Sequence, residues 1–105
     1  MRQEGCSAAE PYALRVIGDS MEPEFIDGHI IIVDPGMHAA DGAFVVVDYD
    51  GETTLRQIKI DGMRRHLNPL NEKYESIEIT GPCHIRGVVV QRATPGRRRE
   101  SKHYN

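Results

Sequence analysis

The residues best suited to chemistry in this chain are Gly18 to Pro23, which read Gly-Asp-Ser-Met-Glu-Pro. They directly follow the expected strand at residues 12–17. A serine on a tight turn at the end of a strand can expose its hydroxyl, with backbone N–H groups around it for a developing oxyanion. Gly18 permits such a turn because it has no Cβ. The segment therefore predicts an accessible nucleophile at Ser20, although the same residues taken alone also suit an ordinary turn.

The elements that would position Ser20 are short strands, because apolar runs rich in β-branched residues alternate with Gly, Pro and Asp. Asp50-Gly51 and Asp61-Gly62 favour two-residue hairpin turns, which predicts an antiparallel meander around them. A mostly-β fold with no long helix is expected, and residues 21–25 suit a single helical turn. The expected strands cover residues 12–17, 29–34, 43–49, 53–60, 63–67, 76–79 and 84–92.

Composition limits the class of protein. The chain has 105 residues, enough for one small domain, and its net charge of −3 argues against a surface wholly devoted to nucleic acid. Its apolar runs are far shorter than the roughly 20 residues of a membrane-spanning helix, so a cytoplasmic location is expected. Cys6 and Cys83 form no CxxC pattern, and the five histidines lack metal-ligand spacing. No metal, other cofactor or membrane partner is expected.

Further segments follow Ser20 in a recognisable order: GDSMEPEFIDGHIIIVDP, AFVVVDYDGETTLRQIKIDG, HLNPLNEKY and IRGVVVQR. Together they resemble the self-cleaving serine peptidase domain of the LexA/UmuD type. That domain forms the C-terminal half of LexA and of phage repressors. The resemblance runs from about Tyr12 to Arg92. It implies the rolled antiparallel sheet of the LexA and signal-peptidase fold.

The resemblance also implies a catalytic dyad of serine and lysine. Ser20 corresponds to the nucleophile, and the backbone N–H groups of Ser20 and Asp19 correspond to the oxyanion hole. Gly18, Met21 and Pro23 complete the flanking motif. The family's lysine, a neutral buried base, lies on the strand after an Asp-Gly hairpin. That position is Arg56 here.

Arginine is unsuited to the lysine's role, since its guanidinium is effectively always protonated in proteins. Lys59 is the nearest alternative base, but in a regular strand it points to the opposite face from Arg56 unless a bulge re-aims it. A site formed by Ser20 and His66 stays open, because such sites are assembled in space. Two functions are therefore weighed. One is an impaired LexA-like serine peptidase domain of a self-cleaving repressor or SOS-response protein. The other is a non-catalytic dimerisation or regulatory module.

The expected organisation is an N-terminal arm at 1–11, a LexA-like domain at 12–93 and a basic flexible tail without core positions at 94–105. The family cuts its own chain at Ala-Gly or Cys-Gly, and neither pair occurs here, so a site for autocleavage in cis is not expected. The resemblance implies a homodimer, formed partly through residues 84–92, and contact with the RecA filament. DNA binding would require a separate N-terminal domain.

Overall fold

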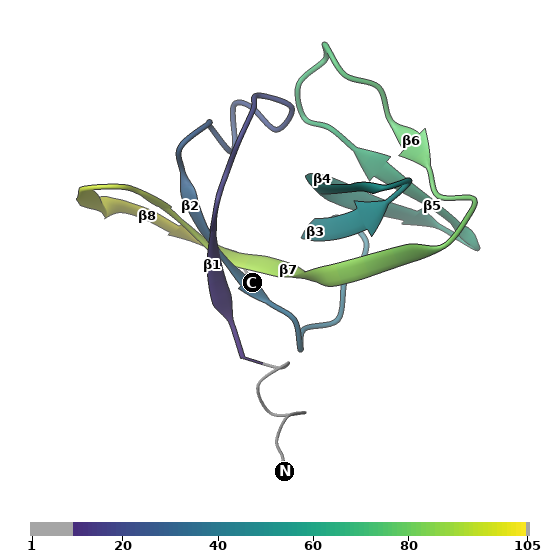
Figure 1. The fold of residues 1–105 in the computed structure, drawn as a ribbon, viewed down its shortest axis with the longest axis horizontal. Coiled ribbons are helices and arrows are strands. Elements are labelled where there is room, and N and C mark those ends of the chain that lie inside the picture. The colour runs from purple at the N-terminus through teal and green to yellow at the C-terminus, as the bar shows by residue number, and fades with distance from the viewer. Residues whose placement is uncertain (1–9, 105) are drawn as a thin grey trace.

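The computed structural model describes residues 10–104, without the side chains of residues 97–100. Within this range the chain forms one antiparallel sheet and no long helix, as the sequence predicts, but the sheet has eight strands where seven were expected. Neighbouring strands follow the order β1-β2-β7-β3-β4-β5-β6, with β8 added beside β7 (Figure 1). The strands are β1 (Tyr12–Arg15), β2 (Ile30–Asp34), β3 (Phe44–Tyr49), β4 (Glu52–Asp61), β5 (Arg64–Asn68), β6 (Ile77–Glu78), β7 (Cys83–Thr94) and β8 (Arg97–His103).

The long strand β7 joins the two halves of the sheet. Its first part pairs with β3 and its second part with β2, so it extends beneath both halves in Figure 1. The register shifts opposite Val46/Val47 and again opposite Ile32/Val33. Such irregularities bend a strand and increase its twist. The resulting roll encloses two apolar clusters.

One cluster lies on the β1–β2 side and the other on the β3–β5 side. Val88 and Val89 are neighbours on β7, so their side chains point to opposite faces, one into each cluster. The apolar run Gly87-Val88-Val89-Val90 near the end of the chain therefore contributes to the core through Val88 and Val89. The first cluster contains Val16, Met21, Phe25, Ile31, Val33, Val46 and Val89, and the second contains Val45, Val47, Ile58, Leu67 and Val88.

Gly87 lies on β7 with the end of β2 packed close against it. A Cβ added there would stand 2.6 Å from Val33 Cγ1 and 2.9 Å from the backbone oxygen of Asp34. Because both neighbours belong to the packed sheet, Gly87→Ala is expected to lower the free energy of unfolding by about 1–3 kcal/mol. Urea denaturation measures this, with Gly81→Ala as the matched control, since no atom lies within 4 Å of a Cβ there. Equal stabilities of the two variants would contradict the predicted clash.

Both predicted hairpins form, but the turn of the second one is shifted by one residue. Asp50 and Gly51 have φ values of 54° and 81°, as a turn with two positive φ angles requires. At the second hairpin, Asp61 still pairs with Arg64, so the turn consists of Gly62 and Met63 rather than Asp61 and Gly62. The reason is that Gly62, with φ of 62°, supplies the positive φ at the first turn position.

The end of the chain differs from the predicted flexible tail. β8 pairs with β7, and Tyr104 packs against the first apolar cluster with its ring centroid 5.5 Å from those of Phe25 and Phe44. The prediction that this segment carries no core position is therefore wrong at Tyr104. Charged residues are common on strands at the margin of a sheet, so the composition of β8 concealed it. Of the predicted N-terminal arm, residues 1–9, with Cys6, lie outside the described residues.

Glu24 ties the end of the chain to the turn that contains Ser20. Its carboxylate accepts hydrogen bonds from Lys102 Nζ at 2.8 Å and from the Tyr104 hydroxyl at 2.5 Å. Arg92 Nη1 lies 3.4 Å from the same carboxylate and donates to the Glu24 backbone oxygen. Partial burial alone would raise the pKa of Glu24, but these hydrogen bonds and positive charges lower it overall from its usual 4.5.

Glu24→Gln is expected to lower the free energy of unfolding by about 1 kcal/mol at pH 7. A pKa depressed in the folded state gives stability that is present above the unfolded-state value and is lost as the pH falls through the folded one. The difference between the two proteins should therefore shrink as the pH drops below 4.5. Urea denaturation at pH 7 and at several more acidic values measures it. A difference that stays constant with pH would contradict the assigned role of the carboxylate.

Candidate active site

Ser20 lies on a turn that begins directly after β1 and is held at both ends. Gly18 adopts φ of 91°, and its N–H donates to Asp27 Oδ1 at 2.6 Å. One helical turn follows, in which the Phe25 N–H donates to the Met21 oxygen at 2.9 Å, as predicted for residues 21–25. Met21 and Phe25 are buried in the first apolar cluster. The turn is thus anchored by its apolar side chains, while Ser20 itself stays partly exposed.

The loop at residues 69–76 holds Asp19 and Ser20 in place through hydrogen bonds. The N–H groups of Leu70 and Asn71 donate to the Ser20 backbone oxygen at 3.1 and 3.0 Å. Asn71 Nδ2 donates to the Asp19 backbone oxygen, and the Tyr74 hydroxyl donates to the Asp19 carboxylate. These hydrogen bonds were not predicted from the sequence. The one sequence signal for them was the segment HLNPLNEKY, which contributed to the family resemblance but was given no role.

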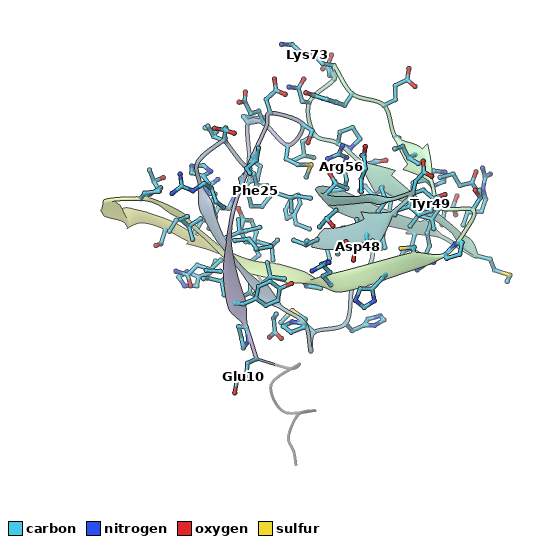
Figure 2. All side chains as sticks on the ribbon, in the orientation of Figure 1. Glu10, Phe25, Asp48, Tyr49, Arg56 and Lys73 are labelled. Atoms are coloured by element: carbon cyan, nitrogen blue, oxygen red, sulfur yellow. The ribbon has the colours of Figure 1, made fainter. Side chains whose placement is uncertain are left out.

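Arg56 reaches Ser20 from β4, where its backbone is paired with Val45 of β3. Its Nη1 donates to Ser20 Oγ at 2.8 Å. The same nitrogen lies 2.7 Å from Thr54 Oγ1 and 2.8 Å from the Leu55 backbone oxygen. Figure 2 shows Arg56 beside β4, on the side toward the loops at the top of the view. The structure therefore brings together the two side chains that the sequence singled out.

The polar groups around Arg56 suit an amine better than a guanidinium. Nη1 carries two hydrogens but faces three acceptors, and the buried Nε has no hydrogen-bond partner. An ammonium group carries three hydrogens on one nitrogen and would match all three acceptors. Partial burial lowers the pKa of Arg56 below its usual range, and the negative charges of Tyr74 and Glu52 partly offset this effect. The group nevertheless remains a cation at neutral pH.

The two alternative bases lie on the other face of the sheet. Lys59 and Arg56 are three positions apart on β4, and the pairing of β4 with β3 and β5 runs without a shift. Lys59 is exposed and directly opposite His66 on β5, so these two side chains share a face that Arg56 does not. No bulge re-aims Lys59 in this part of the chain, and the structure does not bring His66 to Ser20.

A cleft of about 200 Å³ opens beside the serine. It is lined by residues 14–18, which include the end of β1, by residues 53–55 of β4, and by Ser20, Met21, Ile31 and Val46. Within residues 10–104, the N–H groups of Asp19 and Ser20 donate to no other protein group. Those donors are therefore free for a ligand oxygen, as an oxyanion hole requires.

Residues 10–104 contain no helix with the length and apolar character that a membrane crossing requires. In the same range, no three His, Cys, Asp or Glu side chains are grouped so as to hold a metal ion.

A rolled β-sheet that presents a serine on a glycine turn, with a basic side chain within hydrogen-bond distance, defines a class of serine peptidase-like domains. The family model described as "Peptidase S24-like" matches residues 3–90, which is most of the chain. This chain belongs to the S24 peptidase-like family, as the resemblance to LexA and phage repressors implied.

Its curated relatives are regulators. The chain is 43% identical over 95 residues to the HTH-type transcriptional regulator for conjugative element R391 of Providencia rettgeri, covering 84% of this chain and 42% of that protein. It is 40% identical over 87 residues to repressor protein C2 of Salmonella phage P22, covering 77% and 40%. It is 34% identical over 83 residues to the LexA repressor of Methylococcus capsulatus, covering 75% and 41%. The chain thus spans about two fifths of the length of these relatives, as an S24 peptidase-like domain of the LexA and phage-repressor type.

Proposed function

We propose that this domain serves a LexA-type transcriptional repressor as a regulatory module whose peptidase step is impaired by Arg56. The supporting observation is the direction of the hydrogen bond between Arg56 Nη1 and Ser20 Oγ, 2.8 Å long. A general base must accept the hydroxyl proton of the serine. The guanidinium instead donates a hydrogen to Oγ and has no lone pair with which to take one. Ser20 therefore remains a protonated, weak nucleophile.

A second candidate function is an active serine peptidase with Ser20 as nucleophile and Asp19 and Ser20 as oxyanion donors. The free N–H groups and the intact serine turn favour it. The residue at position 56 disfavours it, because no described side chain in contact with Ser20 Oγ can act as base.

One assay separates the two. The purified chain is incubated from pH 7 to 10 with a peptide that carries an Ala-Gly bond, and products are read by mass spectrometry. Ser20→Ala is the blank. We expect no cleavage above this blank at any pH. Cleavage by the unmodified chain that Ser20→Ala abolishes would overturn the proposal and establish the peptidase.

The partners proposed for the module follow from the family. They are a second copy of this chain, the RecA filament, and DNA through a domain outside this sequence. Val88 and Val89 are buried, but residues 83–87 of β7 pair with β3 alone in the described sheet, so one edge of this part of the strand has no strand partner there. A homodimer formed through residues 84–92 would therefore use this edge and exposed side chains such as His84 and Arg86. A dimer mass in solution at tens of micromolar is expected, and a strictly monomeric mass would contradict the homodimer.

A further inference from the structure

The lining of the cleft beside Ser20 combines apolar side chains with a single charged residue. Most of its lining is apolar, and it contains no acidic side chain. Leu14 and Ile17 on its β1 wall are exposed, Ile17 to 84%. Arg15 is the charged residue of the lining. An occupant of this cleft should therefore combine an apolar side chain with a negative charge.

A positive charge, that of Arg56, lies beside Ser20. The guanidinium of Arg56 is partly buried, and no carboxylate of the described residues lies within salt-bridge distance of it. A partly buried cation without a counter-ion is unfavourable unless an anion or solvent compensates it. Two further donors without a protein partner among the described residues, the N–H groups of Asp19 and Ser20, belong to the serine that Arg56 contacts and to the residue before it. Together these groups form a receptor for a small oxyanion rather than for a neutral amide.

The backbone of an extended peptide also has a place here. In the described sheet β1 is paired only with β2, so its other edge is available on the side of the cleft. An added strand can form main-chain hydrogen bonds with such an edge while alternate side chains enter pockets. In the last residue of a peptide, the side chain and the free carboxylate are attached to the same α-carbon. A C-terminal apolar residue therefore supplies both the apolar group and the negative charge that the cleft favours.

We propose that the site binds the C-terminus of a peptide with an apolar last residue. The side chain of that residue occupies the cleft, and the terminal carboxylate lies at the Asp19 and Ser20 N–H groups near Arg56. This inference rests on the proposed function, because it requires a permanent cation where the family has a lysine base. The replacement of that lysine would thus convert a cleavage site into a receptor for a free peptide end, with no bond made or broken.

Fluorescence anisotropy tests this proposal with one pair of probes. The first is fluorescein-Gly-Ser-Val-Val-Ala with a free carboxylate, and the second is the same peptide with a C-terminal amide. With the unmodified chain at pH 7.5, the carboxylate form should bind at least about tenfold more tightly. Arg56→Gln should remove that preference, whereas Arg65→Gln, which alters an exposed cation of β5 outside the cleft lining, should leave it unchanged. Thermal denaturation confirms that each variant is folded.

Three results would overturn the inference: equal binding of the two forms, a preference that survives in folded Arg56→Gln, or no binding of the carboxylate form up to about 1 mM.

Should Arg56→Gln fail to fold, Arg56→Lys serves in its place. Ionic attraction alone would preserve the preference with lysine at pH 6, where the amine is protonated, and lose it at pH 10, where the partly buried amine is neutral because burial lowers its pKa. The unmodified arginine should retain it at both. Failure of the proposed function remains distinguishable, because it appears as cleavage of the Ala-Gly peptide and not as a change in this preference.

Discussion

Arg56→Lys is expected to give Ser20-dependent cleavage of an Ala-Gly peptide at a rate at least about 100-fold above that of the unmodified chain. The three acceptors around Nη1 would hold the shorter amine beside Ser20 Oγ. Burial disfavours the ammonium form, so a lysine there can lose its proton near working pH and accept the serine proton. The rate should therefore rise with pH and then level off once the amine is neutral.

The control for this variant is Arg65→Lys, the same substitution on an exposed residue of β5, which should leave the chain as inactive as before. Adding Ser20→Ala to Arg56→Lys should abolish the gained activity. If Arg56→Lys folds and binds the peptide but does not cut it, the loss of the base is not the reason for the impairment.

Phe25→Ala is expected to have the largest effect on stability, a loss of about 3–5 kcal/mol. Phe25 is fully buried, and its ring centroid lies 5.0 Å from that of Phe44 and 5.5 Å from that of Tyr104. Phe25 belongs to the helical turn that follows Ser20, because its N–H donates to the Met21 oxygen. Removal of its ring therefore leaves a cavity beneath the turn that holds Ser20. For a domain of ordinary stability this is a large fraction of the total. Chemical denaturation monitored by circular dichroism measures the loss.

Met63→Ala is the matched control, because Met63 is fully exposed at the second hairpin and its truncation should change stability by less than about 0.5 kcal/mol. Phe25→Leu should fall between the two, since it retains part of the buried volume. A Phe25→Ala protein as stable as Met63→Ala would contradict the assignment of Phe25 to the core. In the Arg56→Lys background, Phe25→Ala should also reduce cleavage, because the serine turn loses its anchor.

Local signals in the sequence were sufficient for the hairpin at Asp50-Gly51 and for the meander around it. Their physical basis is short-range, since only a few residues tolerate positive φ. The second hairpin shifted by one residue because glycine alone fixes the first turn position there. β8 was missed for the opposite reason. Its charged residues form a strand only because β7 offers a partner and Tyr104 finds an apolar cluster, and such tertiary effects override local propensity.

The site was predictable only in part, for a similar reason. Ser20 was marked by its glycine turn, and the position of Arg56 came from the order of motifs, so their meeting across 36 positions was expected. The support from Leu70 and Asn71 was not, because backbone donors on a backbone oxygen leave no trace in residue types. The mismatch between two hydrogens and three acceptors at Nη1 also required coordinates.

The most direct test of the central claim is the reactivity of Ser20 itself, independent of any peptide. The unmodified chain and Arg56→Lys are treated with a fluorophosphonate, which reacts with activated serines, and adducts are followed by intact mass from pH 7 to 10. No adduct is expected at Ser20 in the unmodified chain at any of these pH values. An adduct is expected in Arg56→Lys, and its rate of formation should rise with pH. Rapid labelling of Ser20 in the unmodified chain would contradict the impairment by Arg56, because the serine would then be activated without a lysine.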